Sequence, residues 1–141
     1  MAEKKLEVDL VEEPVWQKRL EFLKLNAAGK VPVLLIDGKV LSESISIFEY
    51  LEEIHPVPSL LPSEPLKKAE ARRLSLWFDD KFHKEVTANL LYEPGYKKIS
   101  KTGHPDSESI KTGAKKIKFH LDYMNWLLEK RRWLACDYMT I

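Results

Sequence analysis

Four prolines lie close together near the middle of this chain of 141 residues: Pro56, Pro58, Pro62 and Pro65. Proline fixes one backbone angle and has no amide hydrogen, so such a segment interrupts both helices and sheets. Strand-like patterns occur only before it, and only helical patterns follow it. We therefore expect two domains, residues 1–57 and 66–141, joined by a linker over residues 58–65.

The part before the prolines alternates between strand and helix patterns. An apolar/polar alternation predicts a half-buried strand, and apolar residues three or four apart predict a helix. Asp37-Gly38 is a tight-turn dipeptide between two apolar runs, which predicts a β-hairpin. The expected order is βαββα: a strand at 6–11, a helix from Trp16 that stops at 26–29, strands at 31–36 and 39–41, and a helix at 44–55.

The part after the prolines carries only helical patterns. A long helix is predicted over residues 66–91, ended by Glu93-Pro94-Gly95, and a second long helix is expected to pack against it as an antiparallel pair. The predicted inward stripes are Leu74, Phe78, Phe82, Val86 and Leu90 on the first helix, and Ile110, Ala114, Ile117, Leu121, Met124 and Leu128 on the second.

Charge balance and cysteine content exclude several classes of function. With 23 basic and 22 acidic residues the net charge is +1, so no global charge directs the chain to nucleic acid or acidic membranes. No apolar run is long enough to cross a bilayer, and no secretory apolar stretch follows the first lysines. The single cysteine cannot form an internal disulfide, which fits a reducing compartment. We expect a cytoplasmic protein with no membrane or nucleic-acid partner.

Pro32 stands inside an apolar run that otherwise reads as a buried strand. A proline cannot donate a hydrogen bond to a sheet, so it indicates an edge position, a strand start or a special use. One special use is a cis Val31-Pro32 bond, which only a small share of such bonds adopt. A cis bond would turn the backbone groups of Val31 outward, where they could pair with an extended ligand backbone.

Ser42-Glu43-Ser44 lies at the start of the next predicted helix. Ser44 is a suitable N-cap, and helix N-termini attract carboxylates and phosphates. Glu43 could accept a hydrogen bond from a ligand ammonium group. The segment fits the head group of an α-amino acid, although a serine before an apolar helix is more often only a cap.

Two stretches resemble the glutathione-binding, thioredoxin-like domain of soluble glutathione transferases: Asn-Ala-Ala-Gly-Lys-Val-Pro-Val-Leu at 26–34 and Leu-Ser-Glu-Ser-Ile-Ser-Ile at 41–47. The Leu-Leu-Pro connector at 60–62 and the helices after it are similar to the helical domain of that family. The resemblance covers essentially the whole chain. It implies an α/β thioredoxin-like domain of incomplete βαββα order, followed by an incomplete all-α helical bundle.

The resemblance also implies roles for individual residues. In the family the proline is cis, the residue before it bonds the cysteinyl backbone of glutathione, and an acid-serine pair binds the γ-glutamyl end. These roles would fall on Val31, Pro32, Glu43 and Ser44, with Lys30 as a peripheral contact. Glutathione, a small thiol peptide, would be a substrate, and the protein would be a homodimer.

The resemblance is incomplete at both ends of the chain. Residues 1–6 resemble the last turn of the helix after the family's first strand, so that strand and its Tyr, Ser or Cys that acts on the thiol are missing. The catalytic residue is therefore unknown. Residues 133–141 resemble the start of the family's buried core helix. With these parts missing we expect unpaired strand edges and a marginal or aggregation-prone fold.

Two functions follow from the resemblance. The first is a glutathione transferase-like protein that, in its full-length form, binds glutathione and conjugates it to small electrophiles, with a hydrogen-bond donor lowering the pKa of the thiol. The alternative is a non-enzymatic interaction protein. Residues 77–86 and 121–133 are similar to alphaproteobacterial transferase-like proteins that bind FtsZ in cell division.

Other groupings in the sequence favour structural roles. The four histidines lack metal-ligand spacing, and lone histidines usually face solvent or cap helices, so no metal site is expected. Asp79 and Asp80 would point about 100° apart on a helix, too far for a shared proton. Cys136 has no flanking base and is expected to act as a small apolar residue. The basic clusters at 115–118 and 130–132 are expected to solvate helix faces.

Overall fold

The computed structural model describes all of residues 1–141, and they form two units, Met1–Ser59 and Leu60–Ile141. The division lies between Ser59 and Leu60, inside the proline-rich segment.

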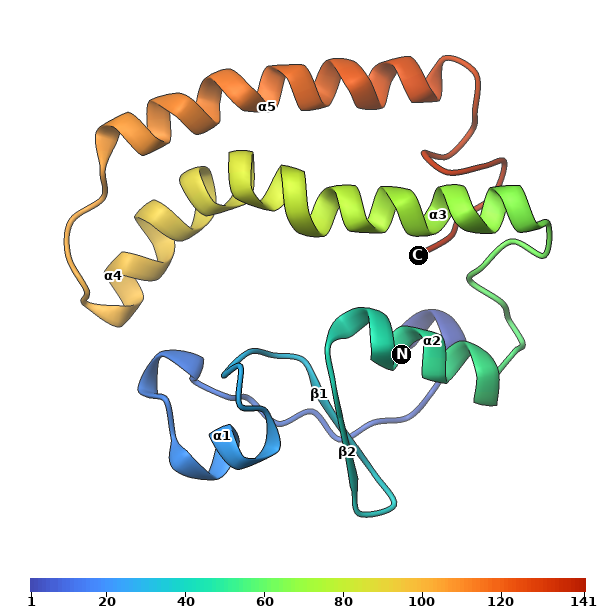
Figure 1. The fold of residues 1–141 in the computed structure, drawn as a ribbon, viewed down its shortest axis with the longest axis horizontal. Helices are drawn as coiled ribbons and strands as arrows, with labels where there is room; N and C mark the ends of the chain where they lie inside the picture. The colour runs from blue at the N-terminus through green and yellow to red at the C-terminus, as the bar shows by residue number, and fades with distance from the viewer. The chain divides into compact units, whose positions relative to one another are not determined.

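The first unit is built on a two-stranded antiparallel hairpin that contacts one helix (Figure 1). The register pairs Val33 with Ser42 and Ile36 with Lys39. The turn residues Asp37 and Gly38 have φ of +48° and +72°, as a tight two-residue hairpin turn requires. The predicted hairpin and following helix are confirmed: β1 spans Val33–Ile36, β2 spans Lys39–Ser42 and α2 spans Ser44–Ile54.

Residues 6–11 do not form the predicted strand. No strand or helix spans them, and the side chains of Leu10 and Val11 are 93% and 84% exposed. The sheet consists of β1 and β2 only. A strand is stable only where its backbone N–H and C=O groups meet those of a neighbouring strand, and an alternating sequence cannot supply that partner. The first strand of the predicted βαββα order was therefore wrong.

The helix predicted from Trp16 is divided into two short pieces. A 3-10 turn, η2, spans Val15–Gln17, and α1 spans Leu20–Leu25. Lys18 between them has a left-handed backbone with φ of +48°, which no continuous α-helix can contain. Gly29 has φ of +63° beyond the end of α1, so the stop predicted at 26–29 is confirmed.

Lys4 is buried in the first unit, at the end of the 3-10 turn η1, Ala2–Lys4. Its Nζ donates hydrogen bonds to the carbonyl oxygens of His55, at 2.7 Å, and Pro58, at 2.9 Å. It also lies 2.6 Å from Oε1 of Glu52. Lys4 therefore fastens the start of the chain to the C-terminal end of α2, and nothing in the sequence pattern predicted this contact.

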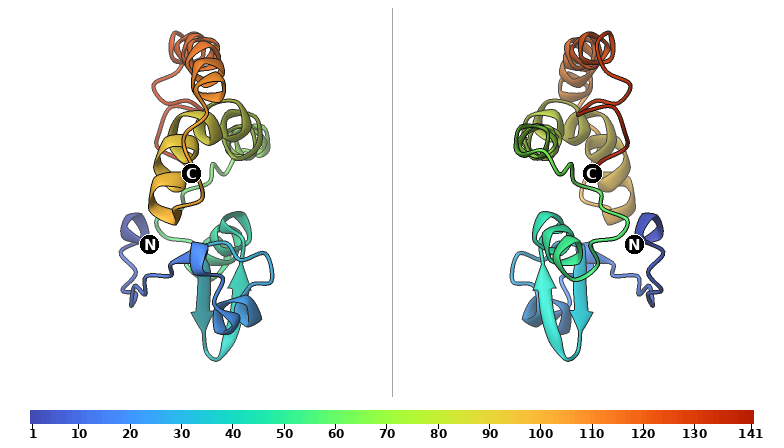
Figure 2. Two further views of the ribbon diagram at one scale, coloured as in Figure 1. Left: turned by 90° about the vertical axis from the view of Figure 1, so that its left-hand side faces the viewer. Right: turned by 90° about the vertical axis from the view of Figure 1, so that its right-hand side faces the viewer.

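The second unit consists of two long antiparallel helices (Figures 1 and 2). The first helix continues past the end that Glu93-Pro94-Gly95 predicted. Pro94 lies inside the π-helical stretch, and the carboxylate of Glu93 beside it accepts hydrogen bonds from Lys97 Nζ and, at 2.7 Å, from the amide of Asp106. The segments are α3, Pro65–Trp77; η3, a wider π-helical stretch over Phe78–Tyr96; α4, Lys97–Ser100; and, after a loop, α5, Ser107–Leu128.

The inward face of α5 is rotated from the predicted stripe. Gly113, His120 and Leu127 are buried, whereas the side chains of Leu121 and Leu128 are exposed. The backbone of Gly113 approaches η3 so closely that a Cβ there would lie 2.8 Å from Cβ of Asn89 and 2.9 Å from Cγ of Leu90. Apolar spacing alone could not detect this, because a glycine and a histidine occupy the contact positions.

Aromatic rings form the centre of the second unit. Trp77 lies 4.8 Å from His120 and 5.1 Å from Tyr123 between ring centroids, and Phe82 lies 5.1 Å from His120. Asp106 caps α5 through its carboxylate, which accepts from the amides of Glu108 and Ser109. None of the helices combines the length and the apolar character needed to cross a bilayer.

Candidate functional site

The hairpin register gathers the predicted site residues at one end of the first unit. Val33, the first residue of β1, faces Ser42, the last residue of β2. The chain that enters β1 through Val31 and Pro32 therefore lies beside the chain that leaves β2 through Glu43 and Ser44. Register is fixed by the turn, so the site is a consequence of the two-residue loop at the opposite end.

The bond between Val31 and Pro32 is cis. Pro32 precedes the first residue of β1, so it removes no hydrogen bond from the hairpin. The side chain of Val31 is 55% exposed, which leaves this stretch accessible to a ligand. Two of the alternatives for Pro32, a strand start and a cis bond, are thus both realised.

Asn26 holds the segment that leads into the cis bond. Its Nδ2 donates to the carbonyl oxygen of Lys30 at 2.7 Å, and its Oδ1 accepts from the amide of Ala28 at 3.1 Å. The side chain is buried, as a positioning residue should be. The sequence predicted Asn26 only as part of a helix stop, and no sequence pattern indicated that its side chain is buried and supports this segment.

The start of α2 differs from the prediction. Glu43, not Ser44, is the N-cap, with φ of +71°, and no side chain caps the helix. Ser44 is the first helical residue, because the first intrahelical bond runs from the amide of Ile47 to the carbonyl of Glu43. The amides of the first turn therefore point outward without a capping side chain, and such a helix start favours an anionic group.

This end of the unit offers three kinds of group to a small peptide. The uncapped first turn of α2 suits a carboxylate, the exposed carboxylate of Glu43 suits an ammonium group, and the backbone around Val31 suits an extended chain. Lys30 is exposed at the same end, although its only hydrogen bond is the one its carbonyl accepts from Asn26. No group of three or more His, Cys, Asp and Glu side chains in residues 1–141 is placed to hold a metal ion.

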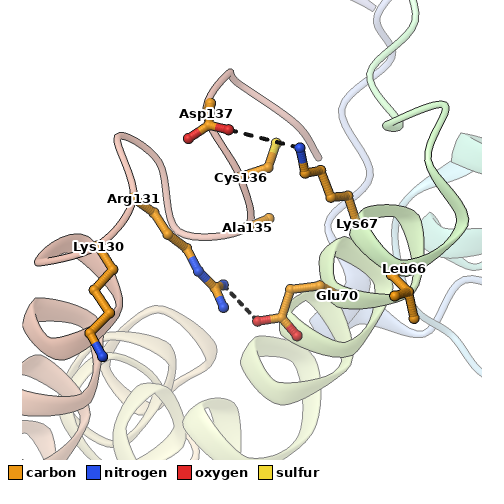
Figure 3. A pocket seen from close by; sticks show the side chains of 8 residues that line it. All are labelled: Leu66, Lys67, Glu70, Lys130, Arg131, Ala135, Cys136 and Asp137. Carbon is orange, nitrogen blue, oxygen red and sulfur yellow. Dashed lines mark hydrogen bonds and ion pairs between the residues drawn. The ribbon is translucent and has the colours of Figure 1, made fainter.

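A cavity of about 400 Å³ lies in the second unit, between α3 and the segment after α5 (Figure 3). Its charged groups are largely paired. Arg131 Nη1 donates to Oε1 of Glu70 at 2.7 Å, and Lys67 Nζ lies 3.9 Å from Oδ2 of Asp137. The lining residues are Leu66, Lys67, Glu70, Lys130, Arg131, Ala135, Cys136 and Asp137.

The ion pairs around the cavity shift the pKa values of Glu70 and Lys67. A hydrogen bond from Arg73, followed by one from Arg131, lowers the pKa of Glu70 to about 2. The hydrogen bond that Lys67 donates to the carboxylate of Glu64 raises the pKa of Lys67. Cys136 is buried and donates its thiol hydrogen to the carbonyl of Tyr138 at 3.3 Å, in agreement with the apolar role expected for it. The arrangement stabilises the segment after α5 and offers no activated nucleophile.

His120 contradicts the expectation that lone histidines face solvent. It is fully buried, and Nε2 lies 3.0 Å from Oε2 of Glu85. A hydrogen bond from Lys81, followed by one from His120, lowers the pKa of Glu85. The carboxylate is therefore ionised at neutral pH and accepts from Nε2–H. The other three histidines, His55, His83 and His104, are exposed as expected.

Comparisons with known proteins agree with this fold. Residues 1–54 match the family model of the glutathione S-transferase N-terminal domain. The whole chain is 37% identical over 146 aligned residues to FtsZ-localized protein A of Caulobacter vibrioides. A stretch of 69 residues, about half of the chain, is 49% identical to a probable maleylacetoacetate isomerase of Caenorhabditis elegans. A glutathione S-transferase structure from Rhodospirillum rubrum superposes on 99% of the chain with a TM-score of 0.94 and 44% identity.

The chain is shorter than these proteins. It spans 64% of the Caulobacter protein and 63% of the Rhodospirillum structure, and the aligned part covers 31% of the Caenorhabditis protein. The family model matches the first unit only, whereas the Rhodospirillum structure superposes on both units. The chain therefore has the fold of the glutathione S-transferases, and its residues 1–54 match the N-terminal domain of that family.

Proposed function

We propose that the first unit binds glutathione as a substrate, and that the longer protein conjugates it to small electrophiles. The observation that carries this proposal is the pairing of Val33 with Ser42, which brings the cis Val31-Pro32 bond next to Glu43 and the uncapped start of α2. The three parts of the site match the backbone, ammonium and carboxylate groups of a γ-glutamyl peptide.

Each residue has a defined part in the proposed complex. The backbone of Val31 pairs with the cysteinyl backbone of glutathione, and the cis bond at Pro32 presents it. Glu43 accepts a hydrogen bond from the γ-glutamyl ammonium group, while Ser44 and the first amides of α2 hold the carboxylate. Lys30 contributes at the edge. Conjugation further requires a donor that lowers the pKa of the thiol, and none of these five residues has that role.

Titration calorimetry with S-methylglutathione tests the proposal without any thiol chemistry. Glu43→Gln and Ser44→Ala each remove one interaction with the γ-glutamyl end, and we expect affinity to fall by about 10-fold or more, as the loss of a charge-assisted hydrogen bond predicts. Lys39→Ala changes an exposed residue at the other end of the hairpin and serves as the control. The proposal would be wrong if the unchanged protein and the three variants bound S-methylglutathione with equal affinity, or if the unchanged protein gave no heat of binding.

A second candidate function is binding of FtsZ without catalysis. The observation that favours it is identity to FtsZ-localized protein A along the whole chain, 37%, beyond the matched N-terminal domain. Co-sedimentation with FtsZ polymer tests this candidate, with unpolymerised FtsZ as the control. Retention with polymer but no heat with S-methylglutathione would favour the second candidate over the first.

We also infer a cytoplasmic location and a homodimer. The location is supported by the single cysteine, which cannot form an internal disulfide, and the dimer by the family resemblance. Sedimentation velocity over a range of concentrations measures the state of the chain; a single monomer boundary throughout would contradict the dimer.

A further inference from the structure

The outer side of α5 carries two large aromatic side chains in solvent. Phe119 is 57% exposed and Trp126 is 54% exposed. They are seven residues apart, so they lie on one face of the helix, together with Asp122 between them and Lys115 one turn before Phe119. Lys130, beyond the end of the helix, lies with its Nζ 5.9 Å from the centre of the Trp126 ring. We call these five residues the α5 outer face.

Trp126 is fixed in position before any partner arrives. Its ring stacks on Tyr123, with centroids 6.1 Å apart and planes 19° apart. Arg73 Nη2 donates to the hydroxyl of Tyr123 at 2.8 Å, and Arg73 Nε donates to Oε2 of Glu70 at 2.7 Å. A side chain held in this way loses little conformational entropy when it is buried in an interface. Trp126 therefore has the properties of a preformed anchor.

Positive charge is concentrated around this face. Residues 111–132 contain seven Lys or Arg and two Asp or Glu, whereas the whole chain is balanced at 23 and 22. Within residues 1–141, no ion pair involves Lys115, Lys118 or Lys130. These ammonium groups are available to a partner that carries carboxylates.

We propose that the α5 outer face docks an acidic segment of a partner protein, with an apolar side chain of that segment against Phe119 and Trp126. Exposed Trp and Phe side chains are enriched at the centres of protein interfaces, whereas the rim around them is polar, and the lysines of this face would lie in such a rim. Charge complementarity selects the acidic partner and raises the association rate. The proposal concerns the second unit alone and requires neither glutathione binding nor FtsZ as the partner.

The same observations disfavour the other occupants. A second copy of the chain would bring two basic faces together, and like charges at an interface are unfavourable. A nucleic acid needs free aromatic faces for its bases, but one side of Trp126 is covered by Tyr123 and Lys130 approaches the ring.

Fluorescence anisotropy with a labelled peptide of repeating Glu-Glu-Phe-Glu units tests the proposal on the whole chain. We expect saturable binding that weakens when salt is raised from about 50 to about 300 mM. The Trp126→Ala and Phe119→Ala variants should each bind at least about 10-fold more weakly, as anchors do. Charge reversal at Lys115 and Lys118, to Glu, should also weaken binding at low salt.

Matched control variants distinguish binding at the α5 outer face from nonspecific binding of the peptide. Leu76→Ala removes an apolar side chain of similar exposure from α3, and Lys98→Glu reverses an exposed charge on α4; both should bind like the unchanged protein. Circular dichroism establishes that each variant is folded. The proposal is overturned if the acidic peptide does not bind, or if a Lys-Lys-Phe-Lys peptide binds equally well. It is also overturned if the control substitutions weaken peptide binding as much as the substitutions on the α5 outer face. Tighter binding of a single-stranded oligonucleotide that depends on Trp126 also overturns it.

Discussion

The Nε2 atom of His120 lies 3.0 Å from Oε2 of Glu85, and this contact joins the middle of α5 to η3. Oε1 of the same carboxylate lies 2.6 Å from Lys81 Nζ. The Nδ1 atom of His120 is buried and has no hydrogen-bond partner. Such an atom lowers stability, so His120 both stabilises the unit through its ring and weakens it through one nitrogen.

Substitution of His120 separates these two effects. His120→Ala removes a ring that three aromatic neighbours surround, and we expect the free energy of unfolding to fall by about 2–4 kcal/mol. His120→Phe keeps the ring and removes the orphaned nitrogen, so its stability should lie within about 1 kcal/mol of the unchanged protein. Urea unfolding measures both. A loss with Phe as large as that with Ala would show that the Glu85 contact dominates.

Gly113 is expected to be intolerant of a side chain. Alanine normally stabilises a helix by about 1 kcal/mol over glycine, but a Cβ at position 113 would collide with Asn89 and Leu90. We therefore expect Gly113→Ala to destabilise the second unit by about 1–3 kcal/mol. Gly95→Ala is the matched control, because nothing lies within 4 Å of its added Cβ. Thermal unfolding followed by circular dichroism should place the two variants on opposite sides of the unchanged protein.

Acid should weaken the attachment of the segment after α5. The pKa of Glu70 is lowered from 4.5 to about 2 by its hydrogen bonds with Arg73 and Arg131. A lowered carboxylate pKa stabilises the fold above the ordinary value, and that contribution is lost as pH falls from about 4.5 to about 2. Glu70→Gln should cost roughly 1 kcal/mol at neutral pH, after allowance for solvent screening, and nothing near pH 2.

The measurement is the difference in urea midpoint between the two proteins across this pH range. Carboxylates elsewhere in the chain titrate equally in both proteins, so the difference isolates Glu70. A difference that stays constant with pH would contradict the assignment.

Lys4 should be essential to the first unit. Lys4→Met removes the donor to two carbonyls and the cation beside Glu52, in a place where the Lys4 side chain is 2% exposed. We expect a loss of about 3–5 kcal/mol, the range for removing one partner of a buried ion pair. Lys24→Met, at an exposed position of α1, is the control and should change stability by less than about 0.5 kcal/mol. Amide hydrogen exchange in α2 reports the effect on this unit directly.

Much of the first unit could be predicted from short stretches of sequence. Asp37-Gly38 specified the hairpin turn, and the turn fixed the register that assembles the candidate site. The cis bond at Pro32 came from the family resemblance, since spacing alone left it as one of three alternatives. The cap of α2 was placed one residue too late, because sequence cannot reveal that Glu43 adopts a positive φ.

The sequence by itself determined the division into a sheet-containing unit and a helical unit, the hairpin, and the helices α2, α3 and α5. These depend on local periodicity and turn chemistry, which neighbouring residues encode. Only the tertiary structure decided that residues 6–11 are not a strand, that the helix continues past Pro94, and that α5 turns Gly113 and His120 inward. Each of these depends on residues distant in sequence: the lack of a partner strand beside residues 6–11, the bond of Glu93 to the amide of Asp106, and the close approach of η3 to α5.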